Sequence, residues 1–208
     1  SGGFQIASLA KNIQISDEAV TFRSHIDGSL KHISPELSIR IQEELGADII
    51  MAFDQPISYG AEKPDIQIGM QRTHDWLIRS IAAHSGTSLL YGIIQGGTYR
   101  DLRTESANFI NSVKGIQGIA IGGLSLGEPK SVLWEMVEVS ADLTSYHMPR
   151  HLLGVGSPED LVEGVGKGID TFDCVLPTRV ARKGSLYTQF GRINITNSKY
   201  RVSNQAIS

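Results

Sequence analysis

The amino-acid sequence predicts an α/β fold, a (β/α)8 TIM barrel that is incomplete in this chain. Apolar runs of strand length alternate with helical stretches from residue 48 to residue 175, and each apolar run ends in glycine or a polar residue. Strands separated by helices of about 12 residues imply βαβ crossovers and a parallel sheet. Five consecutive units favour a barrel over an open sheet, but 208 residues is short, since ~250 is typical of a barrel.

The segment before these units predicts an antiparallel hairpin inserted near the N-terminus. A short apolar run covers residues 4–9, and residues 11–15 and 19–25 are typical of strands. Asp27-Gly28 is a hairpin-turn signal, and residues 30–33 form the returning strand.

Ser34-Pro35-Glu36 then begins a helix, because serine caps a helix, proline suits its first position and an acid suits its first turn. Gly46 ends this helix. Apolar residues four apart predict one buried stripe on it, made of Ile33, Leu37, Ile41 and Leu45.

The repeating part of the chain supplies the barrel elements. The predicted strands are residues 48–53, 89–94, 118–121, 150–155 and 170–175. The predicted helices are 65–84, with Trp76, Leu77 and Ile81 on its buried side, 100–113, 129–143, and one capped by residues 157–160. The polar tail from residue 186 to 208 contains one further strand signal at 192–195.

Residues 1–208 are therefore expected to form a single catalytic barrel domain. Because the chain has no initiator Met and opens on Ser1-Gly2-Gly3-Phe4, which is typical of the middle of an active-site loop, we expect a fragment. The first barrel strands and any element that follows the tail would then lie outside it.

Composition narrows the class of protein. The hydrophobic fraction of 40% is ordinary for a globular domain, and the net charge of -3 excludes a generally basic nucleic-acid binder. The single cysteine, Cys174, excludes a disulfide framework and a Cys-rich zinc site within the chain. The sequence has no apolar run of membrane-spanning length and no signal-peptide pattern. We expect a cytoplasmic protein with no membrane partner.

Chemistry-bearing residues stand where successive strands end, and in a barrel these ends meet in one pocket. Asp54 offers two acceptors to a guanine-like edge, Gln95 can donate to a carbonyl, and Gly123 can present its backbone N–H because it has no Cβ. Phe4 could stack on a base. Each residue alone also has a structural explanation, as a turn or core residue. The residues that close the strands are Asp54, Gln95, Gly122-Gly123, Leu153-Gly154 and Asp173.

The last strand carries the reactive group. Pro177 cannot donate to a sheet, so the strand should end there, and a basic loop containing Arg179, Arg182 and Lys183 should follow. A carboxylate beside phosphate-binding groups suggests that Asp173 attacks a sugar C1′ within a nucleic acid, with exchange by double displacement. The alternative is a turn-capping aspartate next to a solvated basic loop.

Seven motifs in order resemble the tRNA-guanine transglycosylase family, the queuine tRNA-ribosyltransferases, of bacterial type, over nearly the whole chain. The motifs are Ser1-Gly2-Gly3-Phe4-Gln5, residues 22–29 (FRSHIDGS), 48–54 (DIIMAFD), 92–97 (GIIQGG), 120–128 (AIGGLSLGE), 153–156 (LGVG) and 172–179 (FDCVLPTR). The family exchanges guanine at the wobble position of tRNA for a 7-deazaguanine through a covalent enzyme–RNA intermediate, in queuosine biosynthesis.

The resemblance implies a role for each motif. Asp173 is the nucleophile, Leu124 offers its C=O to the exocyclic amine of the incoming base, and Phe4 and Leu153 enclose that base. The implied substrate-binding set is Ser1, Gly2, Gly3, Phe4, Asp54, Gln95, Gly122, Gly123, Leu124, Leu153 and Gly154. The implied RNA-binding set is Gly154, Val155, Gly156, Ser157, Pro158, Glu159, Asp160, Thr178, Arg179, Val180, Ala181 and Arg182.

The sequence also departs from the family pattern. The family's proton-transferring Asp precedes the Ser-Gly-Gly motif, and its zinc subdomain, Cys-x-Cys-x₂-Cys…His, follows the barrel, so neither lies in this chain. We therefore expect no metal ligand here. The resemblance implies tRNA and a small 7-deazaguanine as partners and a homodimer for the complete protein. Leu126 is bulky where eukaryotic members have Gly, which favours preQ1 over queuine, although Pro56 stands where bacterial members often have Cys.

Two other functions remain open from sequence. A non-catalytic tRNA-binding partner subunit would be expected to lack Asp173 or Asp54, and both are present. A barrel glycosidase would need a second carboxylate ~5 Å from Asp173. Asp170 lies three residues earlier on the predicted strand, so its side chain should point to the opposite face.

Overall fold

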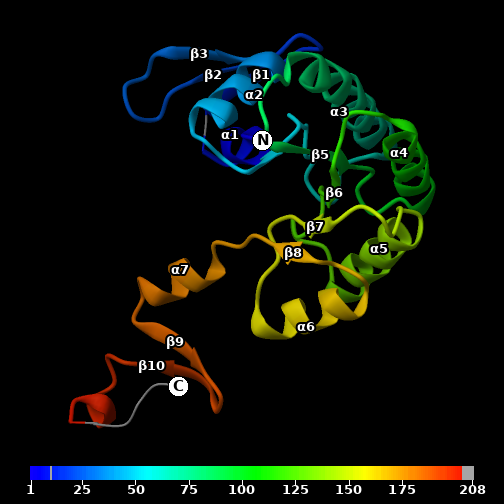
Figure 1. Cartoon of the computed structure of the whole chain (residues 1–208). Helices are drawn as coiled ribbons and strands as arrows, with labels where there is room; N and C mark the ends of the chain where they lie inside the picture. The colour runs from blue at the N-terminus through cyan, green and yellow to red at the C-terminus, as the bar shows by residue number, and fades with distance from the viewer. Residues whose placement is uncertain (10, 203–208) are drawn as a thin grey trace.

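A computed structural model describes residues 1–9 and 11–202, and its centre is one parallel sheet of five strands in sequence order. The sheet is curved, with its helices along the outer side, and so forms a half-barrel (Figure 1). This arrangement confirms the α/β prediction and is compatible with an incomplete (β/α)8 barrel. The strands are β4 (Ile49–Met51), β5 (Leu89–Ile94), β6 (Gly118–Ile121), β7 (Arg150–Leu152) and β8 (Thr171–Phe172).

Four helices connect the strands at nearly the predicted bounds: α3 (Lys63–Ala83), α4 (Arg100–Ser112), α5 (Lys130–Asp142) and α6 (Pro158–Gly166). Trp76 and Leu77 of α3 are fully buried and Ile81 is partly buried, as predicted. One apolar cluster lies between α3, α4 and strands β4 to β6, and a second lies between α5 and strands β6 and β7. The crossover helices thus cover the outer face of the sheet and hold its strand ends in place.

A three-stranded antiparallel sheet precedes the half-barrel. It consists of β1 (Lys11–Ile15), β2 (Val20–Arg23) and β3 (Leu30–Ile33), with Val20 opposite Ile33 and a turn at Gly28, where φ is 71°. The apolar run before it is a helix, α1 (Gly3–Leu9). Trp76 joins this region to the half-barrel, because its Nε1 donates to Asp17 O at 2.7 Å and its ring stacks on Phe53.

Helix α2 (Pro35–Glu44) begins as predicted, with Ser34 Oγ accepting from Leu37 N at 3.3 Å. The predicted stripe of Ile33, Leu37, Ile41 and Leu45 is wrong, however. Ile41 and Leu45 are 39% and 79% exposed, whereas the buried residues of the helix are Pro35, Ser38 and Ile39.

The reason is the free edge of β4. Gln42 Nε2 donates to Met51 O at 2.9 Å, and Gln42 Oε1 accepts from Met51 N at 2.9 Å, so the side-chain amide takes the place of a neighbouring strand. An edge strand needs partners for its backbone groups. The helix therefore faces the sheet with Gln42 and the fully buried Ile39, and leaves Ile41 and Leu45 exposed.

The end of the chain also differs from the sequence expectation. Strand β7 ends at Leu152 and β8 at Phe172, both three residues earlier than predicted. The expected basic loop is a helix, α7 (Leu176–Ala181), with Pro177 in its first turn, where a missing N–H costs no helical hydrogen bond. Strands β9 (Ser185–Thr188) and β10 (Gly191–Asn194) follow as an antiparallel pair, then a 3-10 turn at Ser198–Tyr200.

Helix α7 and this β9–β10 hairpin project away from the half-barrel (Figure 1). The predicted strand at 192–195 corresponds to β10, one residue earlier, while β9 was missed. Residues 203–208 of the predicted polar tail lie outside the described residues.

Candidate active site

Asp54 follows β4 and is 4% exposed. Its Oδ1 accepts from Ser1 Oγ and its Oδ2 accepts from Gln95 Nε2, both at 2.8 Å. Gln95 follows β5 directly, is also buried, and is held by a hydrogen bond from its backbone N to Ser106 Oγ at 3.1 Å. Burial raises the pKa of Asp54, opposed by the hydrogen bonds from Ser1 Oγ and Gln95 Nε2. Among the described residues only one N–H of the Gln95 amide has an acceptor, so the other can donate to a ligand carbonyl.

Glycines allow the backbone to approach these two side chains. A Cβ on Gly3 would lie 2.3 Å from Asp54 O, and a Cβ on Gly123 would lie 2.2 Å from Gln95 Oε1. Gly123 also has φ of +65°, a conformation that favours glycine. A Cβ on Gly122 would lie 2.9 Å from Gln95 Nε2 and 3.3 Å from the Leu153 side chain. Four other predicted substrate-binding positions, Ser1, Gly3, Gly122 and Gly123, are thus packed around the Asp54–Gln95 pair.

Asp173 follows β8, and its side chain is 57% exposed. Its Oδ1 accepts from Gly154 N at 3.0 Å and from His151 Nε2 at 3.1 Å. Among the described residues no group donates to Oδ2, so one oxygen is held by two hydrogen bonds and the other by none. The hydrogen bond from His151 holds the pKa of Asp173 below its usual range, with a further contribution from Gly154 N, against the opposing effect of burial. An ionised, oriented and accessible carboxylate is suited to nucleophilic attack.

Sequence reasoning missed His151, although a signal existed. His151 and Thr171 are paired across β7 and β8, and His151 Nδ1 lies 2.8 Å from Thr171 Oγ1. Side chains two residues apart on a strand share a face. Leu153 and Asp173 were assigned to the pocket. His151 and Thr171, two residues before them, therefore lie on the same face of the sheet.

The two carboxylates follow strands at opposite edges of the sheet. Asp54 and Asp173 follow the first and last strands of the sheet, and the curvature of the sheet turns these edges towards the same open side (Figure 1). The backbone nitrogen of Ser1 lies close enough to Asp54 and Asp173 to interact with both carboxylates. Asp170, by contrast, accepts from Arg150 N at 2.7 Å at the start of β7, and so supplies no second carboxylate beside Asp173.

The remaining predicted substrate-binding residues differ in exposure. Leu124 is buried, Leu153 is partly buried, and Gly154 is exposed with φ of +75°. Phe4 lies on α1 with half of its surface exposed. Its exposed ring is therefore accessible to a partner.

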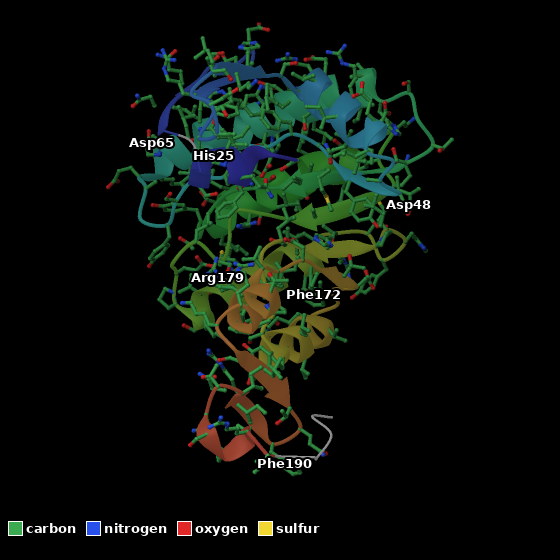
Figure 2. All side chains as sticks on the ribbon, turned by 90° about the vertical axis from the view of Figure 1, so that its left-hand side faces the viewer. His25, Asp48, Asp65, Phe172, Arg179 and Phe190 are labelled. Carbon is green, nitrogen blue, oxygen red and sulfur yellow. The ribbon has the colours of Figure 1, made fainter. Side chains whose placement is uncertain are left out.

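The predicted RNA-binding residues form two groups. Residues 154–160 lead into α6, whose cap is the hydrogen bond from Asp160 N to Ser157 Oγ, and Asp160 also pairs with Lys130 at 2.6 Å. Residues 178–182 lie on α7 and just after it, and Arg179 faces the viewer in Figure 2, on the open side of the half-barrel. Val155 and Val180 are buried, so they are the least accessible to RNA of the two groups.

The zinc site that the resemblance implies does not fit the residues present. The sequence has one cysteine, and the described residues contain no group of three His, Cys, Asp or Glu side chains arranged around a metal. Among the described residues, no helix is long and apolar enough to cross a membrane.

Known proteins similar to this chain share one family name. The family model described as queuine tRNA-ribosyltransferase matches residues 1–208. A queuine tRNA-ribosyltransferase of Herpetosiphon aurantiacus is 52% identical over 201 residues, which are 96% of this chain and 51% of the relative. Relatives with the same name from Halothermothrix orenii and Acetivibrio thermocellus are 50% identical, over 96% of this chain and 54% of each relative. The chain thus spans about half the length of the curated relatives it matches.

Proposed function

Because the chain belongs to the queuine tRNA-ribosyltransferase family, we propose that the protein is a tRNA-guanine transglycosylase. It exchanges guanine at the wobble position of tRNA for a 7-deazaguanine, as a step of queuosine biosynthesis. The observation that carries the proposal is the pairing of two acids at the two outer strands of one curved sheet: Asp173, with one oxygen held by Gly154 and His151, and the buried Asp54, bound to Gln95. One acid is suited to attack a sugar, and the other to bind a purine edge.

The reaction is a double displacement. Asp173 Oδ2 attacks C1′ of the ribose, the C1′–N9 bond breaks, and guanine leaves with the electron pair and takes up a proton. The incoming base then loses its N9 proton and attacks C1′, and the Asp173 carboxylate leaves. The resemblance assigns these proton transfers to an Asp directly before Ser1. Gly154 N and His151 support the step because they hold Oδ1 and leave Oδ2 to react.

The base lies against the strand ends of β4, β5 and β6. Ionised Asp54 accepts from N1–H and the exocyclic amine, while Gln95 and Gly123 N–H donate to the 6-oxo group. Leu124 offers its C=O to the amine of the incoming base, and Phe4 and Leu153 enclose the ring. The exposed face of Phe4 and the contact between Leu153 and Gly122 support this arrangement.

The RNA backbone follows residues 154–160 and 178–182. Thr178, Arg179 and Arg182 are exposed, and among the described residues neither arginine forms an ion pair with a carboxylate. Free guanidinium groups are suited to phosphate. The acidic net charge of the chain makes this local basic surface the better candidate for tRNA.

Four further features belong to the proposal: the incoming base, the cellular compartment, the oligomeric state and the cofactor. The incoming base is preQ1, because Leu126 narrows the site against a larger queuine. The protein acts in the cytoplasm, where its tRNA substrate is found, and as a homodimer, as the family resemblance implies. The chain itself binds no cofactor, and the structural zinc of the family is held by ligands that are not among its residues.

The test is a covalent adduct between the full-length protein and a tRNA anticodon stem-loop, detected on a denaturing gel. Wild type should form the adduct, and Asp173→Asn should not. Asp48→Asn is the matched control, because Asp48 is an exposed carboxylate before the opposite end of β4 (Figure 2). No adduct with wild type, or an equal one with Asp173→Asn, would contradict the proposal.

A further inference from the structure

Arg103 of α4 is a fully buried cation beneath the base-binding strand ends. Its Nε donates to Gly97 O at 2.8 Å, its Nη2 to Gly122 O at 2.8 Å, and its Nη1 to Ile94 O at 3.4 Å. Among the described residues no carboxylate forms an ion pair with it. Burial lowers the pKa of Arg103 to about 9, opposed by Glu128, so the guanidinium stays charged at neutral pH.

A buried charge without a carboxylate partner is costly, and neutral side chains could bind the same carbonyls at lower cost. The position of Arg103 suggests what it contributes. All three of its acceptors lie at the ends of β5 and β6 or in the loops that follow, next to Gln95 and Gly123. A positive charge is thus placed directly behind the donors proposed for the base.

The link to the pocket is the peptide between Gly122 and Gly123. Its C=O accepts from Arg103, and the peptide is trans, so its N–H, which belongs to Gly123, points away from Arg103. Gly123 packs against the Gln95 side-chain amide, and within the described chain its N–H has no acceptor. Hydrogen bonds in series polarise one another, most strongly when one partner is charged. The bond to Arg103 therefore makes Gly123 N–H a stronger donor.

We propose that Arg103 is a positioning residue that fixes and polarises the Gly122–Gly123 peptide, so that Gly123 N–H binds the 6-oxo group of the base and stabilises negative charge on it as the base leaves. This inference rests on the proposed function. Arg103 touches no substrate, and its effect reaches the base through one backbone N–H. Arg103 should therefore increase the affinity most for bases with a strong hydrogen-bond acceptor at position 6.

The experiment compares guanine with 6-thioguanine, which keeps the same donors on its other edge but has a weaker acceptor at position 6. In the full-length protein, Kd for each base is measured by calorimetry for wild type and Arg103→Met. We expect the preference for guanine to fall by about threefold to tenfold in the variant. A structural role alone would weaken both bases equally and leave the ratio unchanged.

Arg150 provides a matched control, because it is also buried and donates to Thr144 O at 2.8 Å and Gly168 O at 3.3 Å, at the other end of the strands. Arg150→Met should lower the melting temperature without changing the base preference. If Arg103→Met does not fold, Arg103→Lys keeps a cation but not the three-carbonyl geometry, and a reduced preference is again expected.

The two proposals fail differently. An unchanged preference in a folded Arg103 variant, with wild type still binding guanine and forming the RNA adduct, overturns only the role of Arg103. Absence of guanine binding in wild type overturns the proposed function together with it.

Discussion

His151 Nε2 donates to Asp173 Oδ1 at 3.1 Å, and this contact orders the carboxylate proposed to attack the ribose. His151 can donate through Nε2 whether or not Nδ1 carries a proton, because Thr171 Oγ1 can either donate to Nδ1 or accept from it. The orientation of Asp173 is therefore kept with either direction of the hydrogen bond between His151 and Thr171.

His151→Ala should move the acidic limb of the kcat/KM profile to higher pH. The hydrogen bond from His151 is the main cause of the lowered pKa of Asp173, so its loss raises that pKa and delays ionisation of the nucleophile as pH increases. The lowered pKa of Asp173 also stabilises the fold at pH values above the pKa of this aspartate in the unfolded chain. This stability is lost as pH falls through the pKa of Asp173 in the folded protein. At neutral pH we expect kcat/KM to fall about tenfold.

His151→Gln, which keeps an N–H donor, should retain more activity, and His147→Ala removes an exposed histidine as a control. An acidic limb that stays in place in His151→Ala would contradict the assignment. The affinity for tRNA should be the same in all three variants.

Binding of guanine should release a proton over the pH range where Asp54 titrates. Burial raises the pKa of Asp54, whereas the N1–H and amine of guanine require the ionised acid. Base affinity should therefore increase as pH rises through the folded pKa. The free energy of unfolding without ligand depends on pH in the opposite direction. The raised pKa of Asp54 stabilises the fold at low pH, and this stability is lost as pH rises through the pKa of Asp54 in the folded protein.

Calorimetry in two buffers with different ionisation enthalpies measures the released proton. Asp54→Asn should show none, and Asp48→Asn should behave as wild type. Equal proton release in wild type and Asp54→Asn would assign the titration to another group.

Gly123→Ala should damage base binding. The new Cβ would lie 2.2 Å from Gln95 Oε1, at a backbone φ of +65° that an L-residue rarely adopts, so the amide must move. We expect guanine affinity to fall by at least about tenfold, since the hydrogen bonds of Gln95 would be lost. Gly166→Ala is the control, because its Cβ would meet open space at the end of α6. Equal guanine affinity in the two variants would show that the close approach is not required.

Gln42→Leu should lower the free energy of unfolding by about 1–3 kcal/mol, because Met51 N–H and C=O would lose their partner at the edge of β4. Denaturant unfolding measures this change. Gln71→Leu alters an exposed glutamine on α3, where only a bond to Asp75 is lost, and should change stability little. A similar small change for Gln42→Leu would mean that water replaces the side-chain amide.

The alternation of elements could be predicted from the sequence because buried parallel strands are apolar runs with glycine or polar residues at their ends. The ends of β5 and β6 were predicted correctly for this reason. The face of α2 was not, because Gln42 binds a strand edge and periodicity alone identifies only apolar contacts. Helix α7 was missed because Pro177 marks both the end of a strand and the first turn of a helix.

The candidate site was predicted only where a residue's own chemistry suggests its role. Asp54, Gln95 and Asp173 have side chains that can bind or react, and they stand at strand ends. His151 and Arg103 act through a second residue, so their place depends on register and packing. Such partners become identifiable only when neighbouring strands are aligned.

Asp173, the proposed nucleophile, and Asp54, the acid proposed to bind the base, follow the two outermost strands of the sheet. The curvature of the sheet therefore sets the distance between the two carboxylates. The distance from the sugar to the far edge of the purine is fixed in a nucleoside. Only one curvature of the sheet therefore places both acids at the matching distance. Small enlargements or truncations of Leu90 or Ile119, which belong to the apolar cluster under α3 and α4, should thus slow turnover well before they unfold the protein.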